Sequence, residues 1–356
     1  MRCCVRPRRG HGRCWRTHCV TRGRSSSRCS TAGCRRATNS GRCCSGRIWP
    51  AASPPRCSAG ADESIRSYLD GWGFSERYVE NFVAPFYGGI TLDRSLATSS
   101  QVFQYTFRTL SEGAIAVPAD GMGAIGEQLA DHAREAGAEI VRNEGVARID
   151  RDRGGATTRG TGPVGVETTE TRREPTALVV ATDPRSAREL TGVEAIPTES
   201  KSSTTQYYSL PGADRVETGN KILLHTDGES PNVVVPLSEV APEYAPDDQT
   251  LLCATFLGAA ALDRDEADLA ADTREALAAW YPERSFESLE PIHTDRLPFA
   301  QFTQPPGFAD DLPTTTTPAG SVYLAGDYTE WSSIQGAMES GRRAASTVLS
   351  AEPVGE

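Results

Sequence analysis

The chain has 356 residues, with 37 basic and 47 acidic side chains and a formal net charge of −10. Residues 1–60 hold fourteen arginines and no lysine or acid, so residues 61–356 carry 37 − 14 = 23 bases against 47 acids, a charge of −24. The acidic part excludes nucleic acid as a partner, because phosphate binding needs clustered positive charge, and the lack of an apolar run of 18 residues excludes a transmembrane helix.

The first 60 residues have an abnormal composition. Nine of the ten cysteines lie there, but they include adjacent pairs, Cys3-Cys4 and Cys43-Cys44, and lack the Cys-x-x-Cys spacing of zinc modules. GC-rich coding DNA translated in a wrong frame yields Arg, Cys, Gly, Ser, Pro and Trp and avoids Lys, Asp and Glu. We therefore expect residues 1–60 to be a frame-shifted, non-native and disordered segment. A zinc module, a disulfide knot, a targeting peptide and a basic nucleic-acid arm stay open as alternatives.

Ordinary helical and strand patterns begin at Asp62. Apolar residues recur at helical spacing at Ile65, Tyr68 and Leu69, and "LATSSQVFQYTFRTLSEG" predicts a second helix that ends near Gly113. The next stretch, "AIAVP", predicts a short strand.

A glycine-rich turn follows this strand. The motif "GMGAIG" (Gly121, Gly123, Gly126) opens a predicted helix, and Glu139 and Glu144 follow at about the spacing at which an acid holds a ribose hydroxyl. The residues "PAD" separate the predicted strand from the first glycine, so the tight strand-to-phosphate turn of a dinucleotide site is not evident. An NAD site and a glycine-rich turn that caps an ordinary helix therefore both stay open.

The middle of the chain alternates between strand and helix signals. "TALVVATDP" predicts a strand buried on both faces, residues 200–260 are rich in strand patterns, and "DEADLAADTREALAAWYP" predicts a helix. The patterns favour an α/β fold with the following division: 1–60 Cys/Arg-rich segment; 61–115 helical part of a substrate domain; 116–195 first segment of a cofactor domain; 196–310 mixed α+β substrate domain; 311–356 C-terminal segment of the cofactor domain.

The closing segment, "SVYLAGDYTEWSSIQGAMESGRRAASTVLS", carries the most specific pattern. Gly326 ends an apolar strand and lets the backbone approach a ligand, and Asp327 offers a carboxylate to a sugar-like hydroxyl. The N–H groups of Ile334, Gln335 and Gly336 lie at a predicted helix N-terminus, which favours an electron-rich group. The alternative is a plain strand–loop–helix with a glycine-rich packing face.

This segment resembles the C-terminal FAD-binding signature of the flavin amine oxidase superfamily, which includes phytoene desaturases and protoporphyrinogen oxidases. "VPADGMGAIGEQLADHAREAGAEIVRNEGVARI", "ALVVATDPRSARELTG" and "RLPFAQFTQPPGF" resemble further family segments in the same order. The resemblance covers residues 62–350. It implies a discontinuous Rossmann-like FAD-binding domain whose ligand contacts would come from these residues: Val146 at the adenine; Gly326 and Asp327 at the ribityl or phosphate side; Ile334, Gln335, Gly336 and Ala337 at the isoalloxazine ring.

The resemblance also implies the reaction, which is removal of a hydride from a C–H bond by FAD. No catalytic side chain and no metal site are assigned. Tyr328 and Trp331 are candidates to line a substrate cavity, with simple packing as the alternative. Amine-oxidising members commonly place a lysine near the flavin, and neither Lys201 nor Lys221 matches that position convincingly. This favours a desaturase-like enzyme for an apolar, carotenoid-type substrate over an amine or protoporphyrinogen oxidase.

One departure from the family pattern is large. The superfamily begins with a strand, G-x-G-x-x-G and helix that hold the FAD pyrophosphate, and residues 1–60 contain no such motif. An inactive remnant and an NAD-binding module therefore stay open beside the enzyme. The single cysteine of the remaining chain, Cys253, and its acidic, halophile-like surface predict a cytoplasmic location. Contact with a membrane surface is left open, as are O₂ or quinone as electron acceptor and the oligomeric state.

Overall fold

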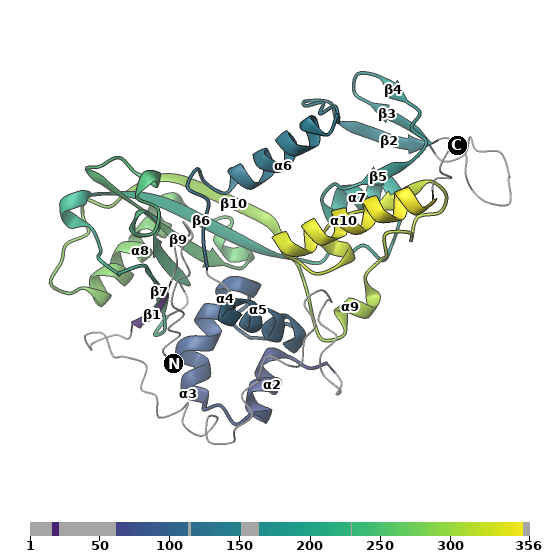
Figure 1. The fold of residues 1–356 in the computed structure, drawn as a ribbon. Helices are drawn as coiled ribbons and strands as arrows, with labels where there is room; N and C mark the ends of the chain where they lie inside the picture. The colour runs from purple at the N-terminus through teal and green to yellow at the C-terminus, as the bar shows by residue number, and fades with distance from the viewer. Residues whose placement is uncertain (1–15, 21–61, 113–114, 151–163, 229, 352–356) are drawn as a thin grey trace. The chain divides into compact units, whose positions relative to one another are not determined.

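The computed structural model describes residues 16–20, 62–112, 115–150, 164–228 and 230–351. The chain divides into two compact units (Figure 1). Unit 1 comprises residues 1–132 and 201–301, and unit 2 comprises residues 133–200 and 302–356. Both units mix helices and strands, and unit 2 is built from two separate stretches of chain. The prediction of an α/β fold with a discontinuous domain is therefore confirmed.

A six-stranded sheet forms the framework of unit 1. Its strands lie in the order β1-β7-β8-β9-β6-β10, and β6 pairs with β9 in antiparallel register, with Tyr208 opposite Leu252. Their bounds are β1 Arg16–Val20, β6 Ser200–Pro211, β7 Lys221–His225, β8 Val233–Pro236, β9 Gln249–Leu257 and β10 Glu290–Phe302. Short 3₁₀ turns connect them: η2 Gly212–Asp214, η3 Leu237–Glu239, η4 Pro242–Tyr244 and η5 Ala259–Ala261.

Strand β1 comes from the segment that we expected to be disordered. Its backbone pairs in parallel with β7, with Arg16 opposite Lys221, so Arg16–Val20 differ from that expectation. The other residues of the segment 1–60 lie outside the described residues, and its proposed frame-shifted origin stays a prediction.

The helical part of unit 1 has its own apolar core. Its elements are α2 Ile65–Gly71, α3 Glu76–Tyr78, the π-helix η1 Val79–Val83, α4 Ala84–Thr91 and α5 Ser100–Glu112. Ser64 caps α2, because its hydroxyl accepts a hydrogen bond from the N–H of Ser67 at 3.1 Å. Ile65 and Leu69, the apolar pair noted in the sequence, are buried in this core. The predicted helical character of this stretch is confirmed.

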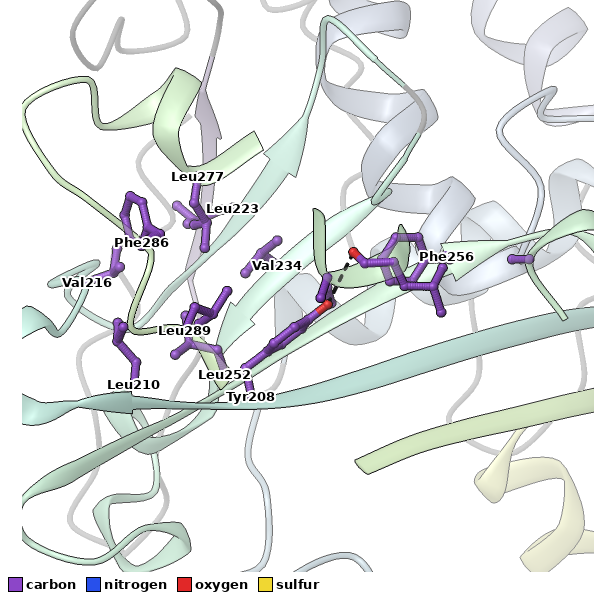
Figure 2. Close-up of a cluster of buried hydrophobic side chains, with 14 residues drawn as sticks. Tyr208, Leu210, Val216, Leu223, Val234, Leu252, Phe256, Leu277, Phe286 and Leu289 are labelled. Carbon is purple, nitrogen blue, oxygen red and sulfur yellow. Dashed lines mark hydrogen bonds between the residues drawn. The ribbon is translucent and has the colours of Figure 1, made fainter. Parts of the chain in front are cut away.

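Helix α8 (Glu266–Trp280) packs its apolar residues into a second core of unit 1 (Figure 2). Its first turn carries Glu266 and Asp268, whose negative charges suit a helix N-terminus. Leu269 and Leu277 are completely buried and join Tyr208, Leu252 and other sheet residues. The hydroxyl of Tyr208 is hydrogen-bonded to Thr273 of the same helix at 2.8 Å.

This core gives a first test of the fold. Leu277→Ala is expected to lower the free energy of unfolding of unit 1 by about 2–5 kcal/mol, because it leaves a cavity among fully buried side chains. The same change at Leu349, which is 74% exposed on a helix, is expected to cost less than about 0.5 kcal/mol. Urea denaturation of both variants measures the difference, and equal costs would contradict the assignment of Leu277 to the core.

The part of unit 2 that the structure describes contains two small sheets. Strand β11 (Val322–Leu324) pairs in parallel with β5 (Leu178–Val180), and β2 (Val146–Asp150), β3 (Gly165–Thr168) and β4 (Arg172–Arg173) form an antiparallel meander. Val179 is 38% exposed, so the predicted burial of the "ALVV" strand on both faces is wrong. The physical reason is that β5 pairs with β11 in a sheet of two strands among the described residues.

The described residues of unit 2 include the helices α7 (Pro184–Thr191), α9 (Phe308–Asp311) and α10 (Ile334–Ala351). Asp183 caps α7 by accepting the N–H groups of Arg185 and Ser186. Pro184 then occupies the first turn, where its missing N–H costs nothing. Helix α6 (Gly123–Glu135) contains the point in the sequence, after His132, at which the chain passes from unit 1 to unit 2. No helix in the described ranges has the length and apolarity that crossing a membrane requires.

Candidate functional site

The predicted site residues of the closing segment lie where β11 ends in unit 2. The N–H of Ala325 donates to the carbonyl of Val180 at 2.9 Å, which extends the parallel pairing by one residue. The chain then forms the 3₁₀ turn η6 (Asp327–Thr329), a serine-containing loop and helix α10. The predicted strand, turn, loop and helix are confirmed. Ligands of open α/β sheets bind at this position, beyond the carboxyl end of a parallel strand.

Gly326 is required by its own turn. A Cβ atom at this position would lie 2.2 Å from Cε1 of Tyr328, although the backbone is extended and accessible to any residue. Its N–H donates to Oγ of Ser340 on α10 at 2.8 Å. The space beside Gly326 that we expected to admit a ligand is thus occupied, at least in part, by the Tyr328 ring.

The two aromatic candidates for substrate contact are buried. Tyr328 has no exposed surface, and its hydroxyl is within hydrogen-bond distance of the carbonyls of Ala325 and Val180, at 3.0 and 3.2 Å. Burial raises the pKa of this hydroxyl. Trp331 is 8% exposed. Tyr328 therefore braces the end of the parallel sheet and does not line an open surface.

Asp327 is the carboxylate of the site. Its Oδ2 accepts a hydrogen bond from Oγ of Ser332 at 3.1 Å, and the backbone N–H of Ser332 donates to Oε1 of the buried Gln304 at 3.0 Å. Burial raises the pKa of Asp327 above its usual range, with partial compensation from the Ser332 hydrogen bond. A half-buried carboxylate of this kind gains from a hydroxyl donor, such as a sugar hydroxyl.

At the N-terminus of α10, the N–H of Gly336 differs from the prediction because it already has an acceptor. The N–H of Gly336 donates to Oγ of Ser333 at 2.8 Å, and the N–H of Ala337 donates to the carbonyl of Ser333 at 3.0 Å. Gly336 is therefore not a free donor, because the Ser333 side chain caps the helix. In the described part of the chain, no group accepts a hydrogen bond from the N–H of Ile334 or Gln335.

Four residues of this site were missed by the sequence reasoning. Ser332 and Ser333 orient the carboxylate and cap the helix, while Gln304 and Ser340 tie the loop to neighbouring backbone. The run "SSIQG" was a usable signal, because serine before a helix is a common N-cap. Nothing in the local sequence around Gln304 indicated its partner 28 residues away.

Val146 begins strand β2, opposite Thr168 of β3. The pairing register shifts between Val146 and Arg148, so the backbone here is irregular. The Val146 side chain is 43% exposed. It borders a groove of about 300 Å³ that is also lined by residues of β2 and α7: Ala147, Arg148, Ile149, Ser186, Glu189 and Leu190. The predicted contact of Val146 with adenine stays a prediction.

The interpretation of "GMGAIG" as an NAD-binding fingerprint is wrong. Residues 115–118, expected to form a strand before the glycines, have no regular secondary structure, and α6 begins at Gly123. Gly121 has a φ of +85°, as expected for a glycine in a turn. Without a parallel strand leading into the turn, the helix N-terminus is not placed at the edge of a sheet, where a dinucleotide binds. The glycine-rich turn that caps an ordinary helix is the arrangement found.

Lys201 lies in unit 1 and is paired with Asp93 by an ion pair and hydrogen bond. Although burial raises the pKa of Asp93, hydrogen bonds from Lys201 and Ser95 hold it below the usual range. Lys221 lies on β7. Within the described ranges, no three His, Cys, Asp or Glu residues gather to bind a metal ion.

Comparison with known proteins places the chain in a family. The sequence matches the flavin containing amine oxidoreductases over residues 51–349. The chain belongs to this family. The predicted superfamily is thus confirmed, and with it the flavin cofactor and an enzymatic, oxidoreductase function. No protein of curated function matches the sequence significantly.

Solved structures of several oxidoreductases share the fold. An oxidoreductase from Methanosarcina mazei is similar with a TM-score of 0.64 and 14% identity, over 81% of this chain and 69% of that one. Putrescine oxidase bound to putrescine is similar with a TM-score of 0.63 and 15% identity, over 95% of this chain and 82% of that one. Cyclohexylamine oxidase from Brevibacterium oxydans IH-35A is similar with a TM-score of 0.55 and 16% identity, over 81% of this chain and 67% of that one.

The described residues fit one part of a flavin. The carboxylate of Asp327 is suited to a ribityl hydroxyl, and the N–H groups of Ile334 and Gln335 are suited to the electron-rich edge of the ring. The phosphate-binding turn of the family, a parallel strand followed by G-x-G-x-x-G and a helix, does not occur among the described residues. That these residues orient the ring and sugar of a bound flavin stays a prediction.

Proposed function

We propose that this chain is an FAD-dependent dehydrogenase of the desaturase type, which acts on an apolar, carotenoid-type substrate. The observation that carries the FAD assignment is the geometry at the end of β11. There, a half-buried Asp327 carboxylate lies in the same loop as the helix N-terminus of α10. A sugar hydroxyl and an electron-rich ring edge are the two groups that this pair suits.

Each residue has a limited role in this proposal. Asp327 accepts a ribityl hydroxyl, and Ser332 holds its carboxylate through the 3.1 Å hydrogen bond. The N–H groups of Ile334 and Gln335 meet the ring, and Ser333 keeps the first turn of α10 closed. Buried Tyr328 and Trp331 keep water out of the base of the loop. Bound FAD supplies the chemistry, which is acceptance of a hydride from a C–H bond.

The state of the lysines supports an apolar substrate. Lys201 and Lys221 are the lysines of the sequence, and Lys201 is held by Asp93. A lysine whose ammonium group is held by a carboxylate is less available to assist amine oxidation, and this supports a polyene substrate. O₂ or a quinone serves as electron acceptor in this proposal. An apolar substrate also implies contact with a membrane surface from which it is taken.

Amine oxidation is the second candidate. It is favoured by the similarity to putrescine oxidase and cyclohexylamine oxidase, although identities of 15% and 16% carry only the fold. Oxidation of a porphyrinogen is a further alternative within the same superfamily. An inactive remnant, in which the fold is kept and the cofactor is lost, is the outcome to exclude first.

The test is purification of the full chain, followed by a search for its cofactor. We expect flavin absorbance in the purified protein, or after addition of FAD and gel filtration. Flavin reduction is then followed without oxygen in the presence of a carotenoid polyene, a primary amine or a porphyrinogen. Reduction by the polyene alone supports the desaturase, and reduction by the amine supports the second candidate. A folded protein that retains no FAD contradicts the proposed function and supports the remnant.

A further inference from the structure

Glu330 is the charged residue that the described part of the chain buries most completely. It is 7% exposed, and every other buried polar residue there is an uncharged Ser, Thr, Asn or Gln. It lies three residues after Asp327, and its N–H donates to the Asp327 carbonyl at 2.9 Å to close the turn. The proposed function gives Glu330 no role, although it lies in the loop between Asp327 and α10.

The partner of Glu330 comes from the middle of α10. Nη1 of Arg343 lies 3.0 Å from Oε1 of Glu330, and the two side chains are 39% and 4% exposed. Nε of the same arginine donates to Oε1 of Glu339 at 3.0 Å, and Glu339 also accepts Arg342. The guanidinium of Arg343 is therefore oriented by Glu339 on its own helix and reaches the loop in a fixed direction.

The buried charge is costly for the fold. Burial raises the pKa of Glu330, and the nearby Arg343 offsets only part of this effect. A raised pKa means that the ionised carboxylate is less stable in the folded protein than in water. At neutral pH the charge at position 330 therefore lowers the stability of unit 2. Replacement of a buried ion pair by well-packed apolar side chains is often neutral or stabilising, so stability does not account for the presence of this carboxylate.

We propose that Glu330 is a positioning residue, which holds the loop from Asp327 to Ser333 on α10 through Arg343. The loop ends carry the two elements of the site, namely the Asp327 carboxylate and the N–H groups of Ile334 and Gln335. A directional ion pair fixes the spacing between them, which an apolar contact does not do. This inference rests on the proposed function for its consequence, the binding of FAD, while the fixing of the loop stands on its own.

The first test compares three variants of the full chain: Glu330→Gln, Arg343→Gln and the control Arg342→Gln. The two arginines are adjacent on α10 and both contact Glu339, but Arg343 alone of this pair reaches Glu330. FAD affinity is measured from the quenching of flavin fluorescence. We expect about a tenfold loss in the first two variants and less than about a twofold change in Arg342→Gln.

The second measurement separates positioning from simple stabilisation. In Glu330→Gln, hydrogen exchange of the amides from 327 to 336 is expected to accelerate, while the amides of β5 and β11 keep their rates. The thermal midpoint is expected to stay equal or rise. A lower midpoint would show that the ion pair serves stability, and unchanged loop exchange would show that it does not fix the loop. Either result overturns the proposal.

The pH dependence of FAD affinity is a further measurement, which a purely structural role of Glu330 would not alter. The charged groups around the Glu330 carboxylate are Arg343, Arg342 and Glu339 of α10, and Asp327 lies in the same loop. As the pH falls, Glu330 becomes protonated, the ion pair is lost and FAD affinity should fall. Glu330→Gln should remove this part of the profile and keep the part due to Asp327, and a profile identical to wild type overturns the proposal.

Failure of the proposed function is distinguishable from failure of this inference. If the unaltered chain binds no FAD, the proposed function is wrong. The exchange and thermal measurements on Glu330→Gln still decide whether Glu330 fixes the loop.

Discussion

Replacement of Asp327 by alanine is expected to weaken FAD binding about 10- to 100-fold. A hydrogen bond to a charged group contributes about 1.5–3 kcal/mol, and 1.4 kcal/mol corresponds to a factor of ten in affinity. The carboxylate is half-buried and held by Ser332 at 3.1 Å, so no reorientation is needed when a hydroxyl binds. Titration of the full-length variant with FAD, followed by flavin fluorescence, measures the loss.

The controls for this variant separate charge from shape. Asp327→Asn keeps the size and one acceptor oxygen, so its affinity should fall between those of wild type and Asp327→Ala. Without FAD, the raised pKa means that the ionised carboxylate is unfavourable in the folded state at neutral pH. Asp327→Asn is therefore expected to unfold at an equal or higher temperature. Unchanged FAD affinity in Asp327→Ala would show that this carboxylate is not a cofactor ligand.

Gly336→Ala is expected to have the largest effect on the stability of unit 2. A Cβ atom at position 336 would lie 2.1 Å from the carbonyl oxygen of Trp331, and a backbone atom cannot move aside as a flexible side chain can. We expect a loss of about 3 kcal/mol in the free energy of unfolding, together with loss of the helix cap by Ser333. Chemical denaturation monitored by circular dichroism measures the change.

Gly341→Ala is the matched control on the same helix. A Cβ atom there would meet nothing within 4 Å, and alanine is favoured over glycine inside a helix by about 1 kcal/mol. This variant is therefore expected to be slightly more stable than wild type. If Gly336→Ala and Gly341→Ala have the same stability, the close approach of α10 to the Trp331 carbonyl is wrong.

The sequence predicted the local elements of this site well. The apolar run before Gly326 predicts β11, and the serines before Ile334 precede α10, as found. These features depend on neighbouring residues, because strand and helix patterns and caps act over a few positions. The flavin family also followed from one contiguous segment, because a cofactor signature on a single strand, turn and helix is a local pattern.

The errors concern features that depend on distant neighbours. Residues 115–117 of the apolar stretch "AIAV" have the composition of a strand but no strand conformation, because strand formation needs a partner edge that the local sequence does not contain. Val179 has a buried strand's sequence and is 38% exposed, since its burial depends on how many strands flank β5. The donor status of Gly336 depended on the rotamer of Ser333, which no spacing argument provides.

By itself, the sequence determined the abnormal composition of residues 1–60, the α/β class, the cofactor family and the position of the carboxylate Asp327. The tertiary structure decided which groups surround that carboxylate and which donors at the start of α10 are already used. It also revealed the pair of Glu330 and Arg343, thirteen residues apart in the sequence and 3.0 Å apart in space. The physical reason is range: helix, strand and turn preferences act between near neighbours, whereas burial and ion pairing are set by the packing of segments distant along the chain.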